Sequence, residues 1–319
     1  MNHQVRLRVA IAAGLWLLFF TGAGMAVKPG EVSWTAQVVC SYRAIAAQHP
    51  DPKLRNPDYL AGKFLTESYW DTAHSKDYET ARMTMKMYGA AGYYYVNART
   101  HHIDSLLKKM ANAGATQVVI LGAGFDSRAY RFRLIYPRLR FFEVDLPATI
   151  ESKKEKVIQL FGGLPDSVVY APIDFNTQRL EDVLKRLGYD PNQKSYFIWE
   201  GVTAYITEVA CRDTLSFIKN HAAAGSTVVF DYILRPIIEG KYDGFYGAAQ
   251  SASAVAAHGE PYICGWTARE ASDLVQQVGL EIVSDVDTDF LTRQYLIGSD
   301  GQPDGMMGNF HRIMHVRVP

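Results

Sequence analysis

Glycine, carboxylate and aromatic residues directly follow four apolar runs of this 319-residue sequence. Glycine has no Cβ, so two closely spaced glycines let the backbone pass close to a ligand. A carboxylate can accept hydrogen bonds from both hydroxyls of a ribose, because its two oxygens match a vicinal diol. An acidic residue beside an aromatic ring suits an adenine, and a further carboxylate can hold an ammonium group. In chain order, the residues are Gly122, Gly124, Asp145, Asp174, Phe175 and Glu200.

These groups together fit a nucleoside that carries an amino acid. S-adenosyl-L-methionine is such a molecule, and we expect it to be the cofactor. Asp145 would then bind the ribose, Asp174 and Phe175 the adenine, and Glu200 the ammonium group. NAD is the competing ligand. The dinucleotide-binding fingerprint is G-x-G-x-x-G, and Ser127 stands where its third glycine belongs, which disfavours the dinucleotide.

Strands and helices alternate through the middle of the sequence. Short runs rich in β-branched residues are typical of buried strands, and amphipathic segments separate them. The predicted strands cover residues 117–121, 140–144, 168–171, 195–199 and 227–232. Such alternation predicts a parallel sheet with right-handed crossovers. Because ligands of these sheets bind beyond the carboxyl ends of the strands, we expect the six residues to meet there.

The flanking segments have a different character. Residues 31–113 read as aromatic-rich helices and are expected to cap a core formed by residues 114–319. Residues 235–262 are rich in glycine, alanine and tyrosine and are expected to form an irregular insertion. This insertion is expected to select the substrate, because loops on a fixed scaffold usually carry specificity. Without a clear linker after residue 30, we predict one domain over residues 31–319.

The first thirty residues are predicted to be a separate unit. Arg6 and Arg8 precede an apolar run, and small residues follow it, which is the layout of a secretory signal. Extended over residues 9–27, the run reaches 19 residues, about enough to span a bilayer. We therefore expect residues 1–30 to be a signal peptide or a membrane anchor, and the protein to be exported or membrane-associated. A buried helix in a cytoplasmic protein is the alternative.

Composition excludes several classes of protein. With 48% hydrophobic and 21% charged residues, the chain is neither disordered nor a disulfide mini-protein. It carries 33 basic and 33 acidic residues, so no overall electrostatic attraction to nucleic acid is expected. Its three cysteines are far apart and form no C-x-x-C pair. Neither a metal site nor a disulfide framework is therefore predicted.

Several segments also resemble one known family. VVILGAGFDSRAYR, at residues 118–131, resembles the signature of the leucine carboxyl methyltransferase-like family, which includes bacterial S-adenosyl-L-methionine-dependent methyltransferases. FFEVDLP, at residues 141–147, and FIWEGVTAYI, at residues 197–206, are similar to further family segments. Asn97-Ala98-Arg99-Thr100 resembles the helix that precedes the glycine loop. The resemblance covers roughly residues 32–290.

The resemblance implies a class I methyltransferase fold of the α/β class. This is a Rossmann-like seven-stranded sheet with helices on both faces, a last antiparallel strand and, in this chain, a helical N-terminal cap. It also implies that Arg99 binds the methionine carboxylate and that Gly122 and Asp145 contact the cofactor. Where the family usually has Asp-Leu at the adenine, this chain has Asp174-Phe175.

We therefore predict an S-adenosyl-L-methionine-dependent O-methyltransferase. Its acceptor would be a carboxylate or hydroxyl group of a small molecule or protein. A carboxylate needs no general base at neutral pH, whereas a hydroxyl benefits from one, and the sequence identifies no such base. An NAD-linked oxidoreductase and a non-catalytic exported binding protein remain the alternatives. Tyr205 is expected either to line the substrate pocket or to pack in the core.

Overall fold

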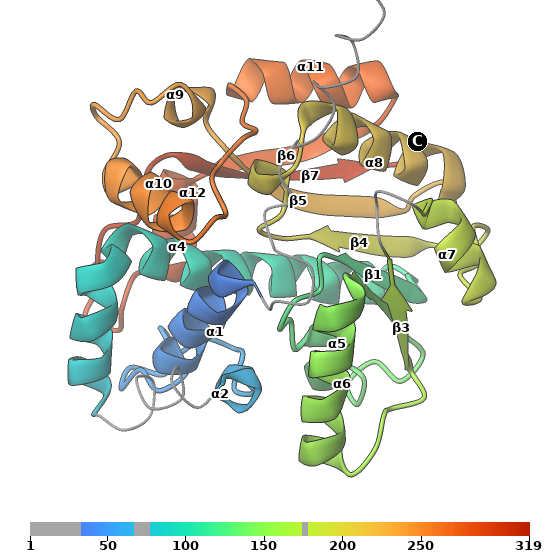
Figure 1. Cartoon of the computed structure of the whole chain (residues 1–319), viewed down its shortest axis with the longest axis horizontal. Helices are drawn as coiled ribbons and strands as arrows, with labels where there is room; N and C mark the ends of the chain where they lie inside the picture. The colour runs from blue at the N-terminus through green and yellow to red at the C-terminus, as the bar shows by residue number, and fades with distance from the viewer. Residues whose placement is uncertain (1–32, 67–76, 174–177) are drawn as a thin grey trace, which may run out of the picture.

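The computed structural model describes residues 33–66, 77–173 and 178–319, which build a seven-stranded sheet between two layers of helices (Figure 1). The strands lie in the order β3-β2-β1-β4-β5-β7-β6. Their bounds are β1 Gln117–Leu121, β2 Arg140–Asp145, β3 Val168–Pro172, β4 Ser195–Trp199, β5 Thr227–Ile233, β6 Glu281–Asp287 and β7 His311–Arg317. Strands β1 to β5 pair in parallel, whereas β7 is antiparallel to both β5 and β6. This confirms the predicted sheet with its antiparallel last strand.

The central strands are buried along their whole length. Every residue of β1 and of β4 is buried, as expected for parallel strands that helices cover on both faces. Successive side chains point to opposite faces. Val118 and Ile120 therefore join one apolar core, while Val119 and Leu121 join the other.

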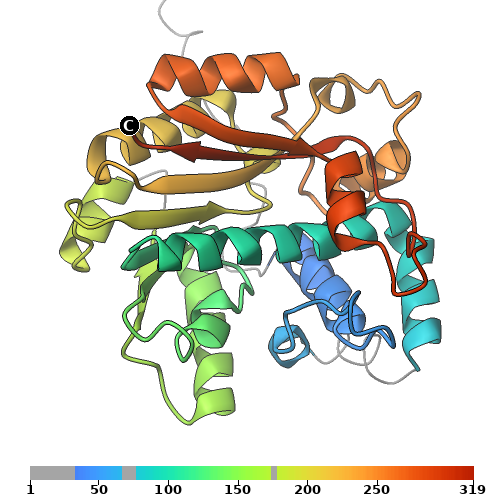
Figure 2. The same cartoon turned by 180° about the vertical axis from the view of Figure 1, so that it is seen from behind.

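Each core is closed by its own set of helices. On one face lie α1 (Trp34–Ala46), α2 (Ala61–Phe64), α4 (Tyr78–Asn112), α5 (Arg128–Phe132) and α6 (Pro147–Phe161). On the other lie α7 (Leu180–Arg186), α8 (Glu208–His221) and α11 (Ala268–Val278). Figure 2 shows α4 running along the sheet as the longest helix of its layer. The remaining short helices are η1 (Thr203–Tyr205), α9 (Arg235–Ile238), α10 (Ala248–Ala257) and α12 (Thr288–Tyr295).

Local sequence explains several helix ends. The Ser33 side chain accepts a hydrogen bond from the backbone N–H of Ala36 and so caps α1, as the sequence predicts. Pro147 occupies the first turn of α6, where its missing N–H costs nothing. Gly162 ends the same helix in the left-handed conformation. These capping residues determine where α1 begins and where α6 begins and ends, and therefore where the connecting loops lie relative to the sheet.

The structure differs from the sequence prediction in two segments. Residues 78–112 form one long helix with a kink at Gly89, whereas the sequence pattern predicts one helical segment that ends at Arg99 and a second over residues 101–113. A Cβ on Gly89 would lie 3.0 Å from the Tyr42 hydroxyl, so glycine lets α1 and α4 approach closely. Residues 235–262 are not irregular throughout, because they contain α9 and the alanine-rich α10. Alanine is the best helix former, which explains α10.

Within the described ranges, no helix combines the length and the apolar character needed to cross a bilayer. The predicted signal peptide or anchor, residues 1–30, lies outside those ranges. It therefore stays a prediction.

Candidate functional site

A cavity of about 1180 Å³ lies beyond the carboxyl ends of β1, β2 and β4. Five of the seven predicted site residues line it: Arg99, Gly122, Gly124, Asp145 and Glu200. The other two, Asp174 and Phe175, lie outside the described residues and stay predictions. Helices α1, α4, α7, α8 and α10 supply much of the remaining wall together with η1. The topology thus brings together residues that are far apart in the sequence.

In the loop after β1, the backbone of Gly122 lies close to the Val202 side chain. Gly122 has a φ of 66°, and a Cβ built on it would collide with the Val202 side chain. The backbone N–H groups of Gly122 and Ala123 both donate to the carbonyl of Val144, at 2.9 and 3.0 Å. Gly124 has a φ of 40° and faces α1 at Ala36. Glycine is therefore required at position 122 on steric and conformational grounds together.

Asp145 is held firmly at the end of β2. Its carboxylate accepts hydrogen bonds from the backbone N–H of Gly124 at 2.6 Å and of Leu146 at 2.7 Å. Burial raises the pKa of Asp145, and these two amides oppose that effect. An ionised carboxylate offers about four acceptor positions, so two such bonds leave capacity for a further donor.

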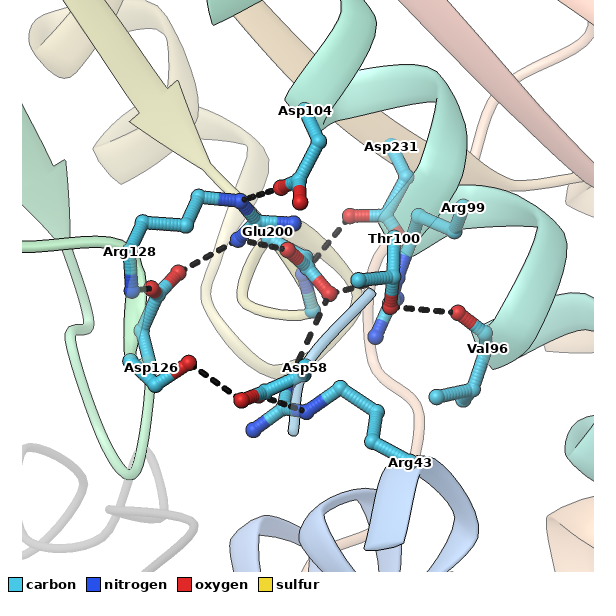
Figure 3. A network of polar contacts seen from close by, with 12 residues as sticks. Arg43, Asp58, Val96, Arg99, Thr100, Asp104, Asp126, Arg128, Glu200 and Asp231 are labelled. Carbon is cyan, nitrogen blue, oxygen red and sulfur yellow. Dashed lines mark hydrogen bonds and ion pairs between the residues drawn. The ribbon is translucent and has the colours of Figure 1, made fainter. Parts of the chain in front are cut away.

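A buried ion-pair network forms the floor of the cavity (Figure 3). Arg99 Nε lies 3.0 Å from one oxygen of Glu200, and Arg128 Nη1 lies 2.6 Å from the other. Arg99 also pairs with Asp231, whose second oxygen accepts the backbone N–H of Gly201 at 2.6 Å. These contacts join α4, the start of α5, the end of β4 and the end of β5 in one unit.

The arginines decide the charge of Glu200. Burial by itself would raise the pKa of this carboxyl. Arg128, Arg99 and Arg43 outweigh that effect and lower the pKa of Glu200 to about 2. Glu200 is therefore an anion at neutral pH. Because a carboxylate accepts several hydrogen bonds, an ammonium group can still add to the network from the cavity side.

Further pairs extend the network behind the cavity. Arg43 Nε lies 3.0 Å from Asp58, and Arg43 Nη2 donates to the carbonyl of Phe125 at 3.0 Å. Asp104 accepts from Arg128 at 2.7 Å and from Arg131 at 2.6 Å. The network contains four arginines and five carboxylates, a net of one negative charge. Its members are Arg43, Arg99, Arg128, Arg131, Asp58, Asp104, Asp126, Glu200 and Asp231.

Sequence reasoning missed some of these residues. Arg43 and Asp231 both line the cavity, and neither was predicted. The available signal was a charge inside an otherwise apolar pattern. Arg43 stands among the apolar positions of α1, and Asp231 interrupts the apolar run of β5. Such charges are rarely buried unless they are paired.

The remaining wall is aromatic and apolar. Tyr205 lines the cavity, with its ring 5.5 Å from that of Tyr262. Tyr205 meets both expectations in part, because it lines the cavity and also packs against a small apolar cluster that contains Ala204 and Ile237. The ring of His311 also lines the cavity and stacks on Tyr95, with the ring centroids 3.9 Å apart. The cavity therefore combines a charged floor with an apolar side.

Known proteins resemble this chain over most of its length. The family model described as leucine carboxyl methyltransferase matches residues 36–219. A Bacillus subtilis protein named "Putative S-adenosyl-L-methionine-dependent methyltransferase YktD" is 31% identical over 192 residues, which is 60% of this chain and 62% of that protein. A Streptomyces coelicolor protein of the same description, SCO7813, is 30% identical over 221 residues, 69% of this chain and 75% of that one.

Two solved structures share the fold. A DUF574 family protein from Streptomyces avermitilis has a TM-score of 0.58 at 14% identity, covering 91% of this chain and 99% of that protein. A "putative methyltransferase" from Thermobifida fusca has a TM-score of 0.53 at 13% identity, covering 91% and 96%. At these identities the likeness concerns the fold alone. Together with the family model and the two relatives, it leads to one conclusion. This chain belongs to the leucine carboxyl methyltransferase family of S-adenosyl-L-methionine-dependent methyltransferases.

Proposed function

We propose that this chain transfers the methyl group of S-adenosyl-L-methionine to an oxygen atom of an acceptor, either a carboxylate or a hydroxyl. The observation that carries the proposal is one cavity in which the glycine loop, Asp145 and the charged network share a wall with a separate apolar surface. The match to a family of carboxyl methyltransferases supports oxygen as the methylated atom.

The residues of the charged floor fit the cofactor. Its methionine end carries an ammonium, a sulfonium and a carboxylate group, a net of one positive charge. The network described above carries a net of one negative charge, so the two are complementary. We assign Asp145 to the ribose hydroxyls, Glu200 to the ammonium group and Arg99 to the methionine carboxylate. Asp174 and Phe175 are assigned to the adenine by sequence alone.

The chain's own groups would mainly bind and align the reactants. When bound, S-adenosyl-L-methionine supplies a methyl group that is already activated on a sulfonium. Asp145 and the glycine loop hold the nucleoside end, while the ion pairs of Arg99 and Glu200 fix the amino-acid end. The acceptor then needs only a fixed approach and a site from which water is excluded.

The type of methylated atom can be tested directly. The full chain would be incubated with methyl-labelled S-adenosyl-L-methionine and a panel of acids, phenols, amines and thiols. A methyl ester releases labelled methanol in mild alkali, whereas an aryl methyl ether does not. Label in an ester or ether supports the proposal, and label confined to nitrogen or sulfur acceptors contradicts it. Asp145→Ala, compared with the exposed Asp166→Ala, checks that the turnover comes from this site.

A further inference from the structure

Part of the cavity wall carries no charged side chain and includes none of the residues assigned to the cofactor. We name it the acceptor wall and define it as Val38, Val39, Tyr42, Gly92, Val96 and Val255. It comes from α1, α4 and α10, of which α1 and α10 both pack on α4. A Cβ on Gly92 would lie 3.4 Å from the Tyr42 ring, so glycine leaves this part of the cavity open.

His311 lines the cavity, and one of its two ring nitrogens has no hydrogen-bond partner among the described residues. It begins β7, opposite Ile233 of β5, and its ring stacks almost parallel on Tyr95, at 10°. Its Nδ1 atom is buried and has no hydrogen-bond partner among the described residues. A buried polar atom without a partner is uncommon and points to an absent ligand or water. His311 therefore marks a place where the wall can still bind a polar group.

We propose that the acceptor wall and His311 together bind a small apolar monocarboxylate, with its carboxylate toward His311 and its hydrocarbon part on the acceptor wall. This inference rests on the proposed function and names its acceptor. The cavity has room for both molecules. Its volume of about 1180 Å³ exceeds the range of about 300–1,000 Å³ that is typical for one ligand.

The surroundings of His311 decide the protonation of its ring. Arg99 from α4 and Asp231 from β5 flank the Tyr95 ring on which His311 stacks, and they pair with each other. Burial and the positive charge of Arg99 lower the pKa of His311 well below its ordinary value. The imidazole is therefore neutral and weakly basic. It can donate a hydrogen bond to a carboxylate, but it is poorly suited to take a proton from a hydroxyl.

The acceptor wall disfavours a polypeptide or a polar diacid. A peptide would bring backbone N–H and C=O groups against valine side chains, where they would lose their hydrogen bonds to water. A second carboxylate on this wall would meet no cation, because none of its six residues is basic. A hydrocarbon chain loses nothing there and gains from the burial of its surface.

Calorimetric binding to the full chain, saturated with S-adenosylhomocysteine, tests this inference. The probes are hexanoate, octanoate and decanoate, with adipate and a tetrapeptide ending in leucine as polar comparisons. We expect decanoate to bind most tightly, with about a two- to four-fold gain for each added methylene. His311→Phe keeps the stacked ring and removes both nitrogens, and should weaken decanoate binding about five-fold. Gly92→Leu should fill the space along the acceptor wall and weaken decanoate binding at least as much.

Ala90→Leu is the matched control for Gly92→Leu, since Ala90 is half-buried on the same helix and does not line the cavity. It should leave decanoate affinity within two-fold of the wild-type value. Tighter binding of adipate or the peptide, or no binding of any fatty acid, would overturn the inference. So would a decanoate affinity that His311→Phe leaves unchanged. Wild-type protein that fails to bind S-adenosylhomocysteine would instead overturn the proposed function, on which the inference depends.

Discussion

The two sides of the cavity differ in polarity, because one side is charged and the other is apolar. The charged floor belongs to a network of nine charged side chains that are already paired with one another, and five of the nine line the cavity. The acceptor wall consists of valine side chains, one tyrosine and one glycine, and His311, whose Nδ1 is unpaired among the described residues, lines the same cavity. The ion pairs of the charged floor are thus formed before any ligand binds, whereas the acceptor wall offers a ligand mainly an apolar surface.

This difference indicates which part of the site binds the cofactor and which part binds the acceptor. A network that joins several helices and strands cannot change one member without disturbing the rest, so it suits a cofactor that is always the same. An apolar wall tolerates substitution as long as its volume is kept. We therefore expect changes in the floor to affect both folding and cofactor binding, and changes in the acceptor wall to affect only the choice of acceptor.

The largest effect is expected from removing a central cation of the floor. Arg128 is 1% exposed and contacts Asp104, Asp126 and Glu200. Arg128→Met should lower the free energy of unfolding by about 3–5 kcal/mol, because it leaves buried carboxylates without a partner. Urea unfolding monitored by circular dichroism measures this loss. The control, exposed Arg138→Met, should change stability by less than about 0.5 kcal/mol. Equal effects of the two substitutions would show that the network is not stabilising.

A slightly smaller effect is expected at the glycine loop. Gly122→Ala should cost about 2–5 kcal/mol of unfolding free energy, from the positive φ and from the collision with Val202. Gly162→Ala has a similar φ of 76° and open space around it, so it isolates the conformational part. The excess of the first substitution over the second should disappear in Gly122→Ala/Val202→Ala. An excess that survives in this double variant would contradict the proposed steric collision between a Cβ at position 122 and Val202.

Cofactor binding should distinguish the two sides of the cavity. Asp145→Ala should weaken binding of S-adenosylhomocysteine by about 1–3 kcal/mol, because a charged acceptor is lost. Val39→Ala on the acceptor wall should leave the same affinity within two-fold, since Val39 is given no part in holding the cofactor. Calorimetric titration of both variants measures the contrast. A reversed order would mean that the cofactor lies on the acceptor wall.

The smallest effect concerns pH. The folded-state pKa of Glu200 is about 2, below its ordinary value of 4.5, so its stabilising contribution is complete above pH 4.5 and is lost as pH falls toward 2. The cost of Glu200→Gln in unfolding free energy should therefore stay constant, within about 0.5 kcal/mol, between pH 7 and pH 4.5. Below pH 4.5 it should shrink. Urea titrations at pH 7, 5.5, 4.5 and 3.5 check this, and a cost that already falls between pH 7 and 5.5 would refute the assignment.

Local patterns were sufficient to predict the sheet and the strand-end residues. Apolar runs bounded by glycine or acid predicted five parallel strands, and the crossover rules placed Gly122, Asp145 and Glu200 at one edge. The ion-pair partners of these site residues were not predictable in this way. The contact between Arg43 and Glu200 depends on how α1 folds across the glycine loop, and no nearby residue encodes that packing. His311 reaches the cavity only because β7 runs antiparallel beside β5.

The chain's continuous helix α4 shows the same limit. The sequence pattern suggests a helix boundary near residue 100, yet residues 78–112 form one helix that is kinked at Gly89 and packs against α1. This continuity matters for the site, because it sets Arg99 and Tyr95 on one helical turn facing Asp231. The sequence could identify Arg99 by family resemblance, but only the structure reveals its partners.

The central claim is that the charged floor binds an adenosyl amino acid. Calorimetric titration of the full chain with S-adenosyl-L-methionine, S-adenosylhomocysteine and NAD, in parallel, tests it most directly. We predict that both adenosyl ligands bind and that NAD does not, with the affinity for both ligands reduced in Asp145→Ala. Binding of NAD alone, or of none of the three by a folded protein, would contradict the account.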